Sequence, residues 1–221
     1  MHEQAQEAMF TFPGSISLNA GCAFEEFARY IEQGQRRLYL YGSILDPDED
    51  ERSTIGRSMI GEVMEMILHY NREDVGKPIE EREPIRLYIN SPGGDLAEGF
   101  ALISVIEASK TPVYTINFGQ LSSMSFLIGI TGAKRYSLKY TPFLLHDGSS
   151  FVGGSTGKVQ DRVEFDTRYG EEIIKPHVLS HGKMTSEEYD SHRRDEFYML
   201  PKDALAYGFI DEIVDDLDVI L

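Results

Sequence analysis

The feature that most restricts the fold is a succession of elements that occurs twice in the middle of the chain. Residues 85–89 (IRLYI) alternate like a strand and end at the turn NSPGGD, and residues 96–109 then show helical spacing. Residues 113–118 form a second strand-like run, and an apolar helix begins near Ser122. Strands that alternate with helices favour βαβ units, because a helix must return the chain before the next parallel strand begins. We therefore expect an α/β fold with a mainly parallel sheet.

The remaining elements follow from the same kinds of pattern. Residues 37–42 and 143–145 have the composition of strands. Ser53 is positioned to cap a helix whose apolar face extends to Tyr70. A long polar helix is expected over residues 156–180. Start and stop signals mark two further short helices, and these signals are Thr185, Glu188, Pro201 and Gly208.

The length and charge of the chain limit its organisation and its partners. A chain of 221 residues fits one α/β domain, so we expect a single domain over residues 1–221. Residues 1–22 are expected to form a flexible or partner-ordered arm, and residues 150–185 a protruding helical segment. The 37 acidic and 21 basic residues give a formal charge of −16. Proteins that bind nucleic acids or anionic membranes usually carry clusters of basic residues, which a chain of this charge does not favour, so we expect neither partner.

The sequence predicts neither export nor a membrane span. Its first residues, MHEQAQEAMFTFPGS, lack the basic segment and apolar run of a secretory signal. Residues 111–133 carry no charge, but Pro112 and Asn117 interrupt them, so we interpret them as buried interior. The lone Cys22 excludes an internal disulfide and provides no zinc-ligand spacing. We therefore expect a cytoplasmic protein.

Three polar features fall at the predicted carboxyl ends of strands, where sites form in parallel sheets. The pair Gly93–Gly94 lets the backbone turn sharply and leaves N–H groups free to donate. Ser123 lies at a strand-to-helix turn, where the helix dipole favours a developing negative charge. His146 ends the next strand and is a candidate acceptor for a serine proton. Taken singly, each feature has a structural explanation as a turn, a helix cap or a core histidine.

Taken together, these segments resemble a known family, the proteolytic subunit of Clp protease (ClpP). The motifs that carry the resemblance occur in the family's order, and they are YINSPGG (88–94), GQLSSM (119–124), LH (145–146), RDEF (194–197) and AYGFID (206–211). The resemblance extends from about Arg37 to Val214. It implies the ClpP/crotonase-like α/β superfold, in which residues 150–185 would form a protruding helical handle.

The resemblance also assigns roles to particular residues. Ser123 matches the nucleophile and His146 matches the general base. The backbone N–H groups of Gly94 and Met124 match the oxyanion hole. The resemblance implies a serine endopeptidase that cleaves unfolded polypeptides through an acyl-enzyme on Ser123. It implies no metal and no organic cofactor.

The third member of the catalytic triad is the position at which the sequence departs from the family. Ser191 falls where the family has an aspartate, and Asp190 stands one residue earlier. A serine can accept a hydrogen bond but cannot stabilise an imidazolium by charge. The sequence leaves both residues as candidates for the third member, and a weakened activity is expected if Ser191 serves.

The resemblance further implies an assembly. The family forms two stacked heptameric rings, into which a hexameric AAA+ Clp ATPase feeds unfolded chains. We therefore expect a homo-oligomer with a possible Clp ATPase partner. The positions that match the family's apolar docking pocket are Tyr88, Ile116, Tyr136 and Leu138.

Three other functions are open at this point. The chain could be a weakly active or non-catalytic structural subunit of a mixed ring, which Ser191 would explain. A crotonase-type acyl-CoA enzyme shares the fold, but the pair Ser123 and His146 disfavours it. A signal-peptide peptidase with a Ser–Lys dyad is the third, and no lysine stands in a clear base position for it.

Overall fold

The computed structural model describes residues 34–45, 59–149 and 152–221. Met1–Arg37 and Leu38–Leu221 form two compact units. The arm expected over residues 1–22 lies outside the described residues, and so does the start of the helix expected from Ser53. The expectation of a single domain over the whole chain therefore stays a prediction.

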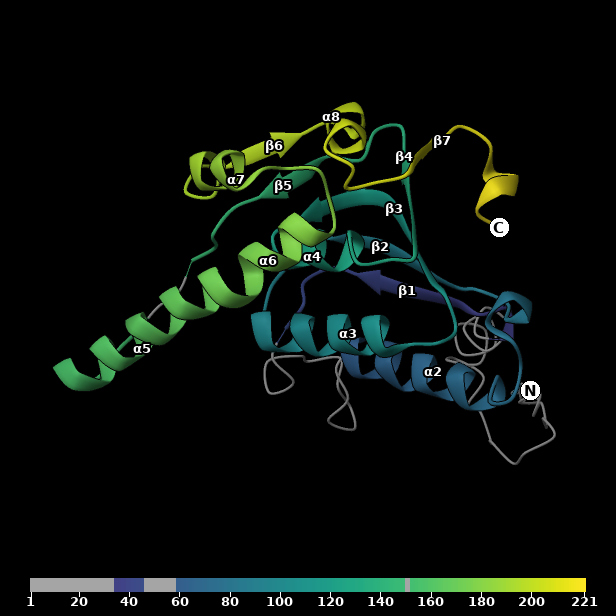
Figure 1. The fold of residues 1–221 in the computed structure, drawn as a ribbon, viewed down its shortest axis with the longest axis horizontal. Coiled ribbons are helices and arrows are strands. Elements are labelled where there is room, and N and C mark those ends of the chain that lie inside the picture. Colours follow the sequence, from purple (N-terminus) through teal and green to yellow (C-terminus); the bar gives the residue numbers. More distant parts are fainter. Residues whose placement is uncertain (1–33, 46–58, 150–151) are drawn as a thin grey trace, which may run out of the picture. The chain divides into compact units, whose positions relative to one another are not determined.

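The described strands form one sheet that is mainly parallel, as the sequence predicts (Figure 1). The strands are β1 (Arg37–Tyr41), β2 (Ile85–Ser91), β3 (Val113–Ser122), β4 (Lys134–Leu138), β5 (Phe143–Leu145), β6 (Phe197–Met199) and β7 (Glu212–Val214). The sheet runs in the order β1-β2-β3-β4-β7, while β5 pairs with β3 and β6 pairs with β5. β3 lies parallel to β2, β4 and β5, and β4 lies parallel to β7. β5 and β6 are antiparallel.

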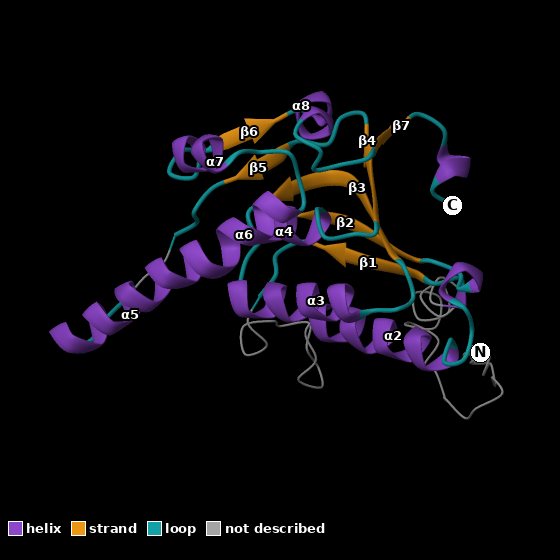
Figure 2. Cartoon of the chain, viewed as in Figure 1, coloured by secondary structure: helices purple, strands orange, loops and turns teal. Residues whose placement is uncertain are grey.

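Helices α2 (Met59–Glu73) and α3 (Leu96–Ala108) pack against each other and cover one face of the sheet (Figure 2). Alternate residues of β2 meet these helices in one apolar core, whose members include Ile60, Ile67, Ile85, Leu87, Ile89, Leu102 and Ile106. Each such side chain contributes roughly 1.5–3 kcal/mol when it is fully buried. Tyr88 belongs to the opposite set of β2 residues and lies in a second apolar cluster.

The handle expected from the sequence is a continuous helical segment that leaves the sheet (Figure 1). It consists of α5 (Thr156–Tyr169), a π-helical turn (Gly170–Ile174) and α6 (Lys175–Ser180). α5 buries none of its residues, whereas α6 buries His177 and Val178. The handle is therefore anchored at its α6 end.

The other helices are short. They are α4 (Met124–Gly129), α7 (Ser186–His192), α8 (Pro201–Ala206) and the 3-10 helices Ile79–Glu81 and Leu217–Val219. The predicted capping box is confirmed, since Thr185 Oγ1 accepts the Glu188 N–H and Glu188 Oε2 accepts the Thr185 N–H. The prediction that Pro201 begins a helix is also confirmed.

Three strands were not predicted, and β3 ends later than expected. β4 begins with two charged residues, while β6 and β7 are three residues long each, so none of them shows the usual alternation. β3 continues to Ser122 instead of ending at Phe118, because its pairing with β2 resumes after an irregularity between Ile89 and Ser91.

The uncharged residues 111–133 divide between β3 and α4 and are mostly buried, as the sequence analysis expected. Within the described ranges, no helix is both long and apolar enough to cross a membrane.

Candidate active site

Ser123 lies at the junction between β3 and α4. Its backbone has φ 56° and ψ −127°, a left-handed conformation that residues other than glycine rarely adopt. Such a conformation costs on the order of 1–3 kcal/mol, so surrounding contacts must hold it. One of them is the hydrogen bond from the Ser123 N–H to Leu144 O at 3.0 Å. A serine on a sharp, strained strand-to-helix turn is the arrangement of a nucleophile elbow, which exposes the hydroxyl at the end of the sheet.

Ser125 stabilises the same turn through hydrogen bonds from a buried hydroxyl. Its side chain is fully buried, and its Oγ accepts the Ser122 N–H at 2.9 Å and donates to Ser91 O at 2.6 Å. One hydroxyl thus joins the end of β2 to the end of β3. Sequence reasoning missed this role, because a serine within an apolar helix gives no local sign of a partner on another strand.

The glycine pair after β2 lies directly beside this turn. A Cβ on Gly93 would stand 2.8 Å from Ser123 Cβ and 2.9 Å from Met124 N. A Cβ on Gly94 would stand 1.8 Å from Ile44 O. Both glycines have positive φ, 97° and 147°, so each position requires glycine for its conformation as well as for its space.

Two backbone N–H groups near Ser123 have no acceptor among the residues that the structure describes. The Gly94 and Met124 N–H groups donate to no described residue. The backbone of Ile44 donates to Gly93 O and accepts from the Asp95 N–H. The Gly94 N–H, which lies between these two residues in sequence, takes no part in this pairing. Both groups are thus free to bind an acceptor, and their role as an oxyanion hole stays a prediction.

His146 follows directly after β5 and is held by a carboxylate. Its Nδ1 lies 3.1 Å from Oε1 of Glu196. An ionised carboxylate can only accept a hydrogen bond, so Nδ1 carries the hydrogen and Nε2 carries the lone pair. Nε2 is buried and has no hydrogen-bond partner among the residues that the structure describes. The ring is therefore oriented for accepting a proton at Nε2.

Strand pairing explains why Glu196 reaches His146. Leu145 and Phe197 form the last pair of the antiparallel strands β5 and β6, so the next residues outward are His146 and Glu196. The Tyr198 hydroxyl donates to the other carboxylate oxygen, Oε2, at 3.2 Å, and this hydrogen bond raises the pKa of Tyr198. The Glu196 carboxylate is thus held at both oxygens.

Ser123 and His146 leave neighbouring parallel strands at the same edge of the sheet. Ser122 pairs with Leu144 in the β3–β5 ladder, and each functional residue follows shortly after this pair. Ser123 Oγ and His146 Nε2 do not hydrogen-bond to each other in this structure. Such bonds often tighten only when substrate is bound, so the arrangement is compatible with catalysis.

The two residues proposed for the third triad position have other partners. Ser191 Oγ donates to Glu188 O at 2.7 Å within its own helix. Asp190 accepts from Lys175 Nζ at 2.7 Å, and this hydrogen bond holds the pKa of the Asp190 carboxyl below its usual range. The choice between these two residues stays a prediction. Glu196 is a third candidate that sequence reasoning missed.

The apolar positions predicted to dock a partner lie together on the sheet. Tyr88, Ile116 and Tyr136 form a buried cluster with Val214 and Ile220, and Leu138 packs against it. The Tyr88 hydroxyl donates to Ile220 O at 2.5 Å. The carboxyl-terminal residues therefore cover part of this surface.

The chain is similar to known proteins over most of its length. The Clp protease family model matches residues 53–216. The ATP-dependent Clp protease proteolytic subunit of Streptococcus equi subsp. equi is 30% identical over 203 residues, which cover 84% of this chain and 95% of that one. The corresponding subunit of Streptococcus suis is 28% identical over 204 residues, covering 86% and 97%. Proteolytic subunit 3 of Synechococcus sp. is 28% identical over 193 residues, covering 84% and 86%.

The mainly parallel α/β fold, the strained serine and the carboxylate-bound histidine define a class, the serine peptidases built on an α/β scaffold. Within this class, the chain belongs to the Clp protease family. The family resemblance and the ClpP-like fold predicted from the sequence are confirmed.

Proposed function

We propose that the chain hydrolyses peptide bonds through an acyl-enzyme on Ser123. His146 Nε2 takes the hydroxyl proton as Ser123 Oγ forms a bond to the peptide carbonyl carbon. The resulting oxyanion accepts hydrogen bonds from the Gly94 and Met124 N–H groups. Nε2–H then protonates the leaving amine as the C–N bond breaks. Water attacks the acyl carbon and gives a proton to Nε2. Nε2–H then returns this proton to Oγ as the ester bond breaks, which regenerates the serine hydroxyl and the neutral imidazole.

The observation that carries this proposal is the state of the His146 ring. Its Nδ1 is bound to Glu196 and its Nε2 is buried without a partner among the residues that the structure describes, so Nε2 is the nitrogen with a free lone pair. A carboxylate on Nδ1 fixes the tautomer and stabilises the imidazolium that forms during the reaction.

The same observation bears on the weakened activity expected if Ser191 served as the third member. We propose that Glu196 takes this role, so that a carboxylate stabilises His146 despite the serine at the family's aspartate position. This supports an active peptidase over a structural subunit of a mixed ring.

Substrates and assembly are also proposals. The similar proteins are named as ATP-dependent proteolytic subunits, and we propose that this chain likewise forms a ring-shaped homo-oligomer, two stacked heptamers, that degrades unfolded polypeptides delivered by a Clp ATPase. A cytoplasmic location stays a prediction. Light scattering of the full chain is expected to give a mass many times 25.0 kDa, whereas a stable monomer would contradict the assembly.

Covalent labelling tests the nucleophile. A fluorophosphonate probe is expected to add once per wild-type chain and not to add to Ser123→Ala, as intact mass would show. Ser122→Ala is the matched control, because it removes the adjacent hydroxyl and should still be labelled. Labelling that survives in Ser123→Ala would overturn the proposal.

A further inference from the structure

A second group of imidazoles and a carboxylate lies away from the candidate active site. Glu107 is in the last turn of α3, His177 is in α6, and His181 directly follows α6. Oε1 of Glu107 lies 3.6 Å from Nδ1 of His177 and 3.7 Å from Nε2 of His181. One potential ligand atom from each residue lies within 4.8 Å of the other two.

These separations fit a shared metal ion better than direct hydrogen bonds. An N–H···O hydrogen bond spans about 2.7–3.2 Å, so both contacts to Glu107 are too long. Nitrogen and oxygen ligands about 2.0–2.1 Å from a tetrahedral zinc stand about 3.3–3.4 Å apart. The observed separations to Glu107 exceed this value by a few tenths of an ångström, and the Glu107 side chain is exposed and able to rotate, while the two imidazole nitrogens lie within 4.8 Å of each other.

The far nitrogen of each ring fixes the tautomer that a metal requires. His177 Nε2 lies 3.1 Å from Leu127 O, and His181 Nδ1 lies 2.8 Å from His177 O. A carbonyl oxygen can only accept, so both far nitrogens carry hydrogen, and the lone pairs are on His177 Nδ1 and His181 Nε2. Metal-binding histidines commonly donate their other N–H to a backbone carbonyl in this way.

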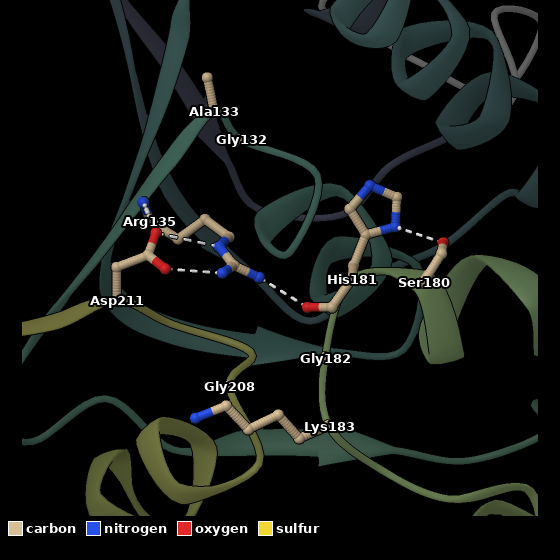
Figure 3. Close-up of a pocket in the computed structure, with 9 residues that line it drawn as sticks. All are labelled: Gly132, Ala133, Arg135, Ser180, His181, Gly182, Lys183, Gly208 and Asp211. Carbon is tan, nitrogen blue, oxygen red and sulfur yellow. Dashed lines mark hydrogen bonds and ion pairs between the residues drawn. The ribbon is translucent and has the colours of Figure 1, made fainter.

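Figure 3 shows how His181 is presented. Its Nδ1 contacts Ser180 Oγ, while its Nε2 lies on the side of the ring away from Ser180. The His181 carbonyl accepts from Nη1 of Arg135 at 2.6 Å, which fixes the backbone at this residue. The side chains of His181 and Glu107 are both partly exposed, so a hydrated ion can reach the cluster from solvent.

The charges around the cluster also suit a cation. The nearby Arg135 guanidinium is bound by the Asp211 carboxylate, with contacts of 2.6 Å and 3.1 Å. Burial raises the pKa of Asp211, but the hydrogen bonds from Arg135 outweigh this and hold the pKa below its usual range. The positive charge of Arg135 is therefore balanced, and Glu107 supplies a negative charge to the cluster.

We propose that Glu107, His177 and His181 bind a divalent transition-metal ion, zinc above all, with water as the fourth ligand. Two neutral imidazoles and one carboxylate form a donor set that zinc accepts. The ion would join α3 to α6 and so anchor the base of the handle. The carbonyl that accepts from His177 belongs to Leu127 in α4. The first residue of the same helix directly follows Ser123. This proposal does not depend on the proposed function.

Calorimetry with Zn²⁺ on the tag-free full chain tests the site. Wild-type protein is expected to bind one Zn²⁺ per chain at this site, and His181→Gln or Glu107→Gln to weaken that binding at least about a hundredfold. Loss of an outer-shell partner alone typically costs about 10–100-fold, so loss of a ligand should cost more. Both side chains are partly exposed, so these substitutions are better tolerated than one at the buried His177.

His69→Gln provides the matched control. His69 also faces a glutamate, since its Nε2 lies 3.3 Å from Oε1 of Glu73, but this pair is exposed on α2 and belongs to no three-residue ligand cluster among the described residues. The His69→Gln variant is expected to bind Zn²⁺ as the wild type does. Equal weakening in the control, or unchanged binding in both His181→Gln and Glu107→Gln, would overturn the proposal and indicate adventitious binding.

Cobalt provides a readout of coordination that does not depend on affinity alone. Co²⁺ added to the wild type is expected to give the intense visible absorption of a four-coordinate site, and this absorption should be absent from His181→Gln. Its presence in both proteins would assign the bound metal to other ligands and contradict the proposal.

Discussion

Histidine and glutamate side chains from other elements meet near both ends of α4, in different arrangements. Near its first residue, His146 is hydrogen-bonded to Glu196 at 3.1 Å through Nδ1. Near its last turn, His177 and His181 face Glu107 at 3.6 Å and 3.7 Å, while backbone carbonyls occupy their far nitrogens. The partner of the second ring nitrogen supports the proposed difference in chemistry. A carboxylate at His146 would stabilise the imidazolium of a proton transfer, whereas the carbonyls at His177 and His181 accept the N–H of a neutral ring whose other nitrogen is free for a metal.

The two ends also differ in how the backbone supports them. The candidate active-site end depends on positive φ at Ser123, Gly93 and Gly94, held by close backbone contacts. The other end depends on regular helical spacing, which places His177 and His181 on one face one turn apart. We therefore expect backbone substitutions to damage the first end and side-chain substitutions to damage the second.

Glu196→Gln is expected to give the largest effect among the variants that sharpen this comparison. An amide can donate to Nδ1 and favour the wrong tautomer, and it removes the negative charge that stabilises the imidazolium. In the Ser-His-Asp template the comparable change costs about 10⁴ in turnover, so we expect at least about a thousandfold loss here, where the carboxylate is more exposed. Single-turnover acylation by a fluorogenic peptide measures it.

Ser191→Ala and Asp190→Ala are the controls for that measurement. Both should retain most of the wild-type acylation rate, because their side chains contact Glu188 and Lys175. If one of them lost activity while Glu196→Gln kept it, the family position and not the observed contact would identify the third triad member.

Gly94→Ala is expected to have a smaller effect through the backbone. Its Cβ would stand 1.8 Å from Ile44 O, so the loop must shift and carry the Gly94 N–H away from Ser123. Loss of one oxyanion donor typically costs about 10²–10³ in turnover. Gly76→Ala is the matched control, because it has φ +88° with no atom within 4 Å of the added Cβ. Equal activity in the two variants would argue against the oxyanion hole.

Acid is expected to lower the stability of the metal-free protein through His177. This effect should be smaller than those of Glu196→Gln and Gly94→Ala. Burial lowers the pKa of His177 below its ordinary 6.5. The hydrogen bond to Leu127 and the charge of Glu107 act in the opposite direction and His181 acts in the same one, and the net pKa is lowered. The unfolded chain therefore takes up a proton before the folded chain does, so stability present above about pH 6.5 is lost as the pH falls further.

Urea unfolding at fixed protein concentration and two pH values measures this effect. The wild-type midpoint should fall between about pH 7.5 and about pH 5.5, and the fall should be smaller in His177→Gln. An equal fall in both proteins would show that other groups cause the acid sensitivity.

Much of the fold and part of the site could be predicted from local patterns. The long polar stretch after Gly153 and Gly154 predicted the handle helix over 156–180, and the spacing of Thr185 and Glu188 predicted the capping box. The short strands β4, β6 and β7 were not predicted, because their three to five residues show too little alternation to be distinguished from loops. The missed β6 explains the missed Glu196, since its place beside His146 follows from β6 pairing with β5.

By itself, the sequence determined the order of strands and helices, the glycine pair beside a turn, and the position of Ser123 where a strand gives way to a helix. These features depend on residues that are near one another in the chain. Only the tertiary structure decided that Glu196, fifty residues from His146, would hold its ring, and that Glu107 would meet two histidines of the handle. Such contacts depend on which strands pair and which helices pack, and packing energy over many residues sets that choice, not the pattern of any one segment.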